Sequence, residues 1–258
     1  MKSENRKPMW EIKQSSDPAV LDIYVYGDVE ADVYDWWNGE IIENNSAEKF
    51  KSALEEHPEA SQINIYINSY GGDVFEGTAI YNQLRRHPAH KTVYVDGFAC
   101  SIASVIAMAG DEVVMPKNTM MLVHNMWMCA VGNATELRKA ADDLEKINAA
   151  GRQAYLAKAG EKLDEAKLVE LMDAETWLTA QECVDLGLAD RFADDDADLT
   201  TSTEMLKKAN AGLQQHLAVN KSIAAKIKAL TEDAVSEPKK KASDPQNQKL
   251  KNLLSKAF

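Results

Sequence analysis

The fold class follows from the segment INIYINSYGGDVFEGTAIYNQLRR, residues 63–86. Its first part alternates isoleucine with polar or aromatic residues, which is typical of a strand with one buried face. Two glycines, Gly71 and Gly72, then interrupt the alternation, and apolar residues recur at helical spacing as far as Arg86. The segment therefore predicts a strand, a sharp turn and a helix, which is the building unit of an α/β domain.

The same alternation of strand and helix continues along the chain. Asn133 with Glu136, and Thr179 with Glu182, have the spacing of helix capping boxes, and Gly97 is expected to turn the chain. Strands are predicted at 21–26, 63–67, 91–95, 113–115 and 120–124, and helices at about 45–57, 74–86, 102–109, 133–159, 163–172 and 179–187. This order predicts an α/β fold with a mostly parallel sheet.

Composition divides the 258 residues into three parts. Residues 1–19 are predicted to be an irregular lead-in, 20–193 an α/β domain that holds any catalytic groups, and 194–258 an acidic linker with a lysine-rich, partly helical or disordered tail. The net charge of −12 argues against nucleic-acid binding. No apolar run reaches the roughly 20 residues of a membrane span. The three cysteines lack metal or disulfide spacing, which predicts reduced thiols inside the cell.

Ser101 lies where the strand at 91–95 leads through Gly97 into the apolar helix at 102–109. A serine at a helix start can attack a carbonyl carbon while neighbouring backbone N–H groups receive the developing oxyanion. The alternative is that Ser101 only caps the helix, which is the commoner role of serine at this position. Ser104, one turn later, is predicted to be buried packing.

Further features accompany this serine along the chain. His124 ends an apolar strand and could act as its base, since the pKa of an unperturbed imidazole is about 6.5. Either Asp173 or Glu175 could orient that imidazole through its Nδ1–H. The pair Gly71-Gly72 lets the backbone approach a ligand closely and could offer N–H groups to it. Taken singly, each also fits a structural role: a histidine at a strand end, solvated carboxylates, or an ordinary turn.

In their order, four segments resemble the Clp protease proteolytic subunit family, over about residues 20–193. They are INSYGGDVFEGTAIYNQL, VDGFACSIASVIAMAG, MMLVHNMW and ETWLTAQECVDLGLAD. In that family a glycine pair follows a strand, and the nucleophile lies in a G-x-x-x-S segment that opens a helix. A histidine then follows a strand, and an acid precedes an aromatic-Leu-Ser/Thr-Ala helix start.

The resemblance implies a serine endopeptidase with Ser101 as nucleophile and His124 as general base. Glu175 stands where the family usually has aspartate, and Asp173 is the fallback acid. The residue after the nucleophile is Ile102 where methionine is usual, which matters little because its backbone N–H is the implied oxyanion donor.

Gly72 is implied to supply the second oxyanion donor. An extended peptide substrate is implied to add as a strand beside Gly71, Asp73 and Val74, and beside Asn125 after the histidine. The proline that the family usually has shortly after the histidine is missing here, where the sequence is Asn-Met-Trp. The geometry of the bound substrate strand is therefore open.

The resemblance also implies an architecture and partners. The fold would be the Clp protease or crotonase-like fold of repeated β-β-α units, with the helix at 133–159 as a projecting handle. A homo-oligomer is implied, a heptameric ring that could stack in pairs. The GDEVVMP and ETWLTA segments and the tail look most like head maturation proteases of tailed phages, which implies scaffold or capsid proteins as substrates in the bacterial cytoplasm. We expect no metal and no cofactor, and leave an ATPase partner open.

Two other functions stay open at this point. A ring-forming assembly protein with a decayed triad is favoured by the glutamate at position 175. An acyl-CoA hydratase or isomerase would share a related fold and a two-donor oxyanion hole, but such enzymes typically rely on carboxylates. The presence of Ser101 and His124 in the expected segments disfavours that second alternative.

Overall fold

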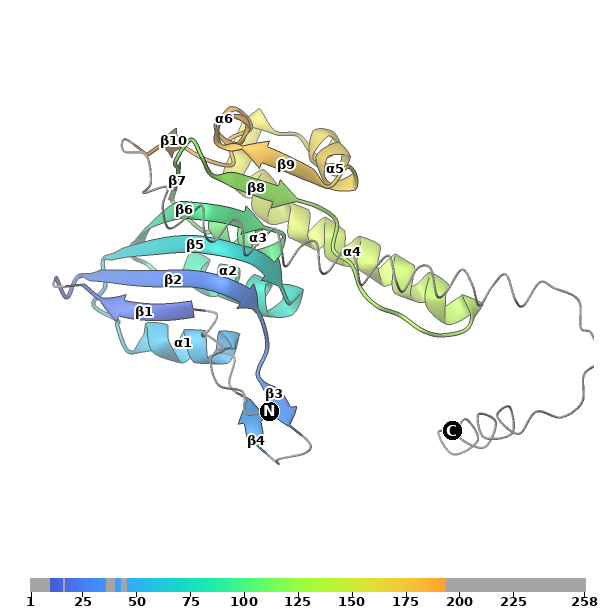
Figure 1. Cartoon of the computed structure of the whole chain (residues 1–258), viewed down its shortest axis with the longest axis horizontal. Helices are drawn as coiled ribbons and strands as arrows, with labels where there is room; N and C mark the ends of the chain where they lie inside the picture. Colours follow the sequence, from blue (N-terminus) through green and yellow to red (C-terminus); the bar gives the residue numbers. More distant parts are fainter. Residues whose placement is uncertain (1–9, 16, 36–39, 43–45, 194–258) are drawn as a thin grey trace, which may run out of the picture. The chain divides into compact units, whose positions relative to one another are not determined.

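The structure is a computed structural model that describes residues 10–15, 17–35, 40–42 and 46–193 (Figure 1). The predictions for the linker and tail after residue 193 lie outside these residues. Among the helices of the described part, none is both long enough and apolar enough to span a membrane.

An α/β arrangement with a mostly parallel sheet is confirmed. In the described residues the main sheet has eight strands in the order β1-β2-β5-β6-β7-β10, with β8 pairing to β6 and to β9. Only the β1–β2 and β8–β9 pairs are antiparallel in this sheet, and β3 and β4 form a separate antiparallel pair. The strands are β1 Trp10–Gln14, β2 Val20–Val29, β3 Val33–Asp35, β4 Glu40–Ile42, β5 Gln62–Gly72, β6 His90–Cys100, β7 Glu112–Met115, β8 Met120–Val123, β9 Thr176–Thr179 and β10 Arg191–Phe192.

The predicted helices are also present. They are α1 Ala47–Glu55, α2 Val74–Arg86, α3 Ile102–Ala107, α4 Ala134–Ala159, α5 Glu165–Asp173 and α6 Ala180–Asp185, with a 3₁₀ turn η1 at Gly160–Lys162. Both predicted capping boxes form, at Asn133 with Glu136 and at Thr179 with Glu182. Ser46 occupies the cap position of α1 without a side-chain capping bond, and the Ala47 N–H donates to the Glu76 carboxylate at 2.6 Å.

The core lies between the sheet and the helices that cover one of its faces. Ile63, Ile65 and Ile67 on β5 are fully buried, and the residues between them are half-buried, as the alternation predicts. Helices α2 and α3 pack on this buried face (Figure 1). The buried residues of α4, from Asn148 to Ala159, all lie in its second half, and its first half extends past the strands (Figure 1).

The expectation that Gly97 turns the chain is wrong, because β6 continues through it to Cys100. The pairing register between β5 and β6 shifts there, so that Ile67 faces Val95 but Ser69 faces Ala99. Extra residues of this kind form a bulge that bends a strand. The first half of β6 therefore pairs with β7, and its second half pairs with β8.

Residues 10–14 are not part of an irregular lead-in, since they form β1 against β2. Trp10 is buried and Ile12 packs partly on the core, while Glu11 and Lys13, which alternate with them, are exposed. This alternation is short, which is why it did not stand out from the charged N-terminal sequence. Strands β9 and β10 were likewise not predicted.

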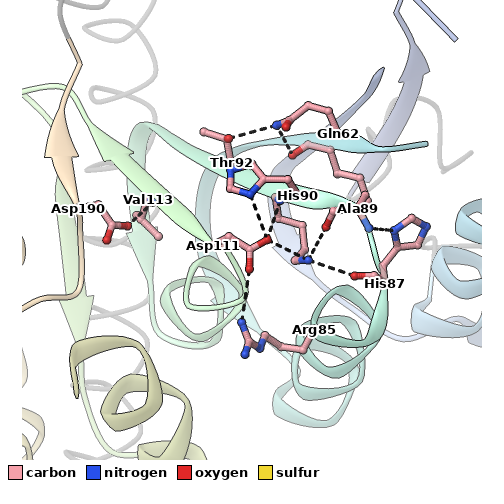
Figure 2. Close-up of polar contacts among 12 residues, drawn as sticks. Gln62, Arg85, His87, Ala89, His90, Thr92, Asp111, Val113 and Asp190 are labelled. Carbon is pink, nitrogen blue, oxygen red and sulfur yellow. Dashed lines mark hydrogen bonds and ion pairs between the residues drawn. The ribbon is translucent and has the colours of Figure 1, made fainter. Parts of the chain in front are cut away.

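A polar cluster lies at the amino ends of the parallel strands (Figure 2). The side chain of Lys91 is 6% exposed, and its ammonium group lies 3.1 Å from the Asp111 carboxylate and 2.6 Å from the Ala89 carbonyl oxygen. Figure 2 shows Asp111 also facing His90 and Arg85, at 3.8 and 3.9 Å. The opposite, carboxyl ends of these strands are where an open α/β sheet usually binds its ligands.

Candidate active site

The carboxyl end of β6 leads directly into Ser101, and β8 runs beside it. Cys100, the last residue of β6, pairs with Leu122 in parallel register. The Ser101 N–H then donates to the Leu122 carbonyl oxygen at 2.9 Å. His124 follows Leu122 by two residues, which places the imidazole and the hydroxyl at the same edge of the sheet.

Strand β9 brings a carboxylate to that edge from the other side of β8. The antiparallel pairing ends at Val123 with Thr176, so His124 directly follows β8 and Glu175 directly precedes β9 at the same end of this pair. Serine, histidine and glutamate therefore come from three neighbouring strand ends.

Ser101 has an unusual backbone conformation, with φ of 54° and ψ of −129°. It occupies the cap position of α3, yet its side chain makes no capping hydrogen bond. The interpretation of Ser101 as only a helix cap is therefore wrong. A positive φ is costly for a residue with a side chain, and strained backbone of this kind clusters at functional sites.

The end of β5 packs against the segment that carries Ser101. A Cβ atom on Gly71 would lie 2.7 Å from the Ser101 Cβ and 3.1 Å from the Ile102 nitrogen. The Gly71 N–H donates to the Ser69 hydroxyl at 3.1 Å, and Gly72 packs so tightly on β2 that a Cβ would lie 2.2 Å from the Val29 carbonyl oxygen. The glycine pair is thus required by close packing at this site.

The imidazole of His124 has a fixed partner. Its Nδ1 lies 2.6 Å from the carbonyl oxygen of Asn125. Because a carbonyl oxygen only accepts, Nδ1 must carry the proton, and in the neutral ring Nε2 is then free to accept one. This is the tautomer that a general base for Ser101 needs.

The two candidate acids are placed differently. Asp173 accepts a hydrogen bond from the Asn125 side-chain nitrogen at 2.6 Å, so it contacts Asn125 and not the imidazole. Glu175 is exposed, has a φ of 49°, and its carboxylate makes no hydrogen bond with the described residues. The buried Asn148 of α4 also fixes this region, since it accepts from the Met126 N–H at 2.8 Å.

The residues predicted to hold a substrate strand lie beside the same edge. Asp73 caps α2, accepting from the N–H groups of Phe75 and Glu76 at 2.8 and 3.0 Å. Its own N–H donates to the Val29 carbonyl oxygen at 2.7 Å. Its carbonyl oxygen accepts from the Gly77 N–H at 3.0 Å, so both backbone groups of Asp73 are already hydrogen-bonded within the chain. Val74 begins α2 and packs partly on the core.

A competing nucleophile stands next to Ser101 in the sequence. Cys100 is buried, and this burial raises the pKa of its thiol to about 12. Because the thiolate is the reactive form of cysteine, the thiol is inert at neutral pH. Within the described ranges, no three His, Cys, Asp or Glu side chains are grouped to hold a metal ion.

One contact at the site has no signal in the sequence. Ser104 is fully buried, as predicted, but its hydroxyl lies 2.6 Å from the Ser101 carbonyl oxygen and 2.7 Å from the Tyr155 hydroxyl. Tyr155 comes from α4, a distant part of the chain. No local spacing links it to Ser104, so only the folded structure reveals the pair.

Comparison with known proteins identifies relatives of this chain. The family description "Clp protease" matches residues 38–196. ATP-dependent Clp protease proteolytic subunit 3 of Rhodococcus jostii is 28% identical over 143 residues, which is 55% of this chain and 70% of that protein. Subunit 2 of Treponema denticola is 33% identical over 140 residues, 53% of this chain and 68% of that protein. The proteolytic subunit of Ligilactobacillus salivarius is 31% identical, with 53% and 70% covered.

Proposed function

The chain belongs to the Clp protease family, and we propose that it cleaves peptide bonds with Ser101 as nucleophile, His124 as general base and Glu175 as the acid. The observation that carries the proposal is the conformation of Ser101. Ser101 stands at a helix start, yet its hydroxyl makes no capping hydrogen bond. Its backbone, with a φ of 54°, is packed against Gly71 on one side and hydrogen-bonded to Leu122 of β8 on the other. A residue with only a packing role would not need this conformation.

The proposed reaction has two halves. The Ser101 Oγ attacks the scissile carbonyl carbon while Nε2 of His124 takes the hydroxyl proton, and the N–H groups of Gly72 and Ile102 receive the oxyanion. The C–N bond then breaks, the imidazolium gives its proton to the leaving amine, and an acyl ester remains on Ser101. In the second half, water gives a proton to Nε2 and attacks the ester. The C–O bond to Ser101 breaks, and its Oγ recovers the proton.

The position of Glu175 supports its assignment as the acid, because it directly precedes Thr176, which pairs with Val123, the residue before His124. Asp173 remains the alternative. Its contact with Asn125 would allow it to act on the imidazole only through that residue. The Asn125 carbonyl oxygen already fixes the tautomer, so the acid's remaining role is to stabilise the imidazolium.

Hydrolysis of an unfolded protein and of short fluorogenic peptides tests the proposal. We expect Ser101→Ala to lower kcat by several orders of magnitude, since removing a serine nucleophile leaves only the residual catalysis of the site. Ser61→Ala is the matched control, because Ser61 is an exposed serine next to β5 at the opposite end of the sheet. Equal activity of Ser101→Ala and the parent protein would overturn the proposal.

A non-catalytic assembly protein is the second candidate function. It is favoured by the Glu175 carboxylate, which makes no hydrogen bond to His124 in the described structure. Under this candidate the assembled protein would cleave nothing, and Ser101→Ala would assemble as the parent does. The family membership disfavours an acyl-CoA hydratase or isomerase.

The proposed substrates are scaffold and capsid proteins during phage head maturation, acted on by a homo-oligomeric ring in the bacterial cytoplasm. The support is the resemblance of the GDEVVMP and ETWLTA segments together with the lysine-rich composition of the tail. Co-expression with the scaffold and capsid proteins of the phage that encodes the chain tests this. Cleavage by the parent but not by Ser101→Ala is expected, and intact substrates with an otherwise active enzyme would contradict it.

A further inference from the structure

A chain of three polar groups runs from α4 to the residue proposed as the nucleophile. The Ser104 hydroxyl lies 2.6 Å from the Ser101 carbonyl oxygen, and the Tyr155 hydroxyl lies 2.7 Å from the Ser104 hydroxyl. Ser104 is 0% exposed and Tyr155 is 2% exposed. These buried groups therefore depend on one another for hydrogen bonding.

The number of protons fixes the direction of each bond. A serine hydroxyl has one proton, and the Ser101 carbonyl oxygen can only accept, so Ser104 donates to it. The Leu122 carbonyl oxygen is also near the Ser104 hydroxyl, but at 3.4 Å. Tyr155 must then donate to Ser104. Burial raises the pKa of Tyr155 to about 12, so the phenol keeps its proton at neutral pH.

The Ser101 carbonyl belongs to the same peptide group as the Ile102 N–H. A trans peptide is planar, so its C=O and N–H point in opposite directions. Bonds from the Ser104 N–H at 3.0 Å and the Ser104 hydroxyl at 2.6 Å hold the carbonyl oxygen on the buried side. The Ile102 N–H is thereby aimed away from the buried side, toward the edge where Gly71 and His124 lie.

We propose that Ser104 and Tyr155 are positioning residues, which aim the Ile102 N–H at the oxyanion by holding the Ser101 carbonyl through a relay of hydrogen bonds. This rests on the proposed function of Ser101 and the Ile102 N–H. Neither side chain touches substrate. The relay makes the geometry of the nucleophile segment depend on the buried half of α4, whose other half extends past the strands.

The alternative is that the pair only fills the core, and a double substitution separates the two roles. Ser104→Ala leaves the Tyr155 hydroxyl buried without a partner, which destabilises the fold. Adding Tyr155→Phe removes that orphan hydroxyl and restores part of the stability. A positioning role predicts that kcat does not recover with it, because the hydroxyl on the Ser101 carbonyl is still missing.

The experiment measures urea unfolding, kcat, KM and inhibition by a peptide boronate, which mimics the tetrahedral intermediate. For Ser104→Ala and for the double variant we expect kcat to fall about tenfold and the boronate Ki to rise about tenfold, with KM changed less than about twofold. Tyr155→Phe should show a smaller loss of the same kind, because the Ser104 hydroxyl is still present and still donates to the Ser101 carbonyl oxygen.

Thr119→Val is the matched control, since Thr119 is also buried and donates to a carbonyl oxygen, that of Pro116, at 2.8 Å. It should lose stability and keep kcat. The proposal is overturned if kcat of the double variant recovers with its stability, or if Thr119→Val loses as much kcat. A parent protein without activity overturns the proposed function and this inference together, whereas an active parent with unaffected variants overturns only the inference.

Discussion

Gly71 approaches the nucleophile segment more closely than any residue with a side chain could. A Cβ atom there would lie 2.7 Å from the Ser101 Cβ and 2.8 Å from the Cys100 carbonyl oxygen, and its φ is +95°. We expect Gly71→Ala to displace Ser101 and lower kcat/KM for a peptide substrate about 100-fold, the scale of a misplacement by one ångström. Steady-state kinetics on the folded variant check this.

Gly27→Ala is the control that separates two effects of Gly71→Ala, the steric clash of the new Cβ atom and the cost of a positive φ. Gly27 also has a positive φ, +112°, but a Cβ there would meet nothing within 4 Å. This control should lose about 1–2 kcal/mol of unfolding free energy, the cost of a left-handed conformation, and keep its activity. The explanation by crowding is wrong if both variants lose activity equally.

The acid can be assigned by comparing two isosteric substitutions. We expect Glu175→Gln to lower kcat about 10-fold to 100-fold, because the imidazolium loses its stabilising charge. Asp173→Asn should cost less than about threefold, since Asp173 contacts Asn125 and not His124. The pH dependence of kcat for both variants completes the measurement, and a larger loss in Asp173→Asn would transfer the role to Asp173.

Sequence reasoning reached Ser101 at the start of a predicted helix, and His124 and the glycine pair at or after the ends of predicted strands, and the resemblance to the Clp protease family joined them into one site. The sequence left the acid open because Asp173 and Glu175 are only two residues apart after a predicted helix. Which of them lies near the imidazole depends on the path of the segment that follows β8, and that path has no sequence pattern. Sequence reasoning could not connect Ser104 with Tyr155, since their contact joins two helices far apart in the sequence. Contacts of that kind follow from tertiary packing and have no local pattern.

At the scale of elements, the start of β6 carries a buried charge, the ammonium group of Lys91 beside Asp111. Burial alone would raise the pKa of Asp111, but the hydrogen bonds and charge of Lys91 outweigh it and hold this pKa below its ordinary value. A carboxylate with a lowered pKa stabilises the folded state above its unfolded pKa, and this is lost as the pH falls through the folded value. The Lys91 side chain, at 6% exposed, has little water to replace this partner.

Asp111→Asn should therefore lower the unfolding free energy by about 2 kcal/mol at pH 7, less than for a fully buried pair because Asp111 is partly exposed. The difference from the parent should shrink below about pH 4, where the carboxylate of the unfolded parent is protonated. Urea unfolding at several pH values measures it. The exposed pair of Glu170 with Lys167 supplies the control, and Glu170→Gln should cost less than about 0.5 kcal/mol.

Element boundaries were predicted best where a capping signal or a long period was present. Asn133 with Glu136 located the start of α4, and Val74 to Arg86 was correct at both ends. The continuation of β6 through Gly97 was missed, because a glycine in a bulge and a glycine in a turn look alike in sequence. Strand β9 was missed because its four residues are too few to show a period.

For the whole molecule, the apolar side chains around the start of α4 bear on assembly. Trp127 is 77% exposed and Val131 is 99% exposed, in the segment that leads into the part of α4 beyond the strands. Exposed apolar groups gathered in one place commonly mark a protein interface. We expect the double substitution Trp127→Ser with Val131→Ser to convert the proposed homo-oligomer into smaller species.

Mass photometry measures this change, with Lys146→Ser on the exposed face of α4 as the control. An unchanged oligomer in the double variant would exclude this segment from the subunit contact.

The α/β class followed from the alternating segments between residues 20 and 193. Ring size is a property of several copies, which the periodicity of one chain does not encode. The repeated β-β-α, crotonase-like description of the fold stays a prediction.

The most direct measurement of the central claim is labelling of the assembled protein with a fluorophosphonate, followed by mass analysis of the intact chain and its peptides. We expect one phosphonyl group per chain on Ser101, and none on Ser101→Ala. Labelling at His124→Ala should be slower by several orders of magnitude. A properly assembled parent protein that takes up no label, or takes it up at another residue, would contradict the account.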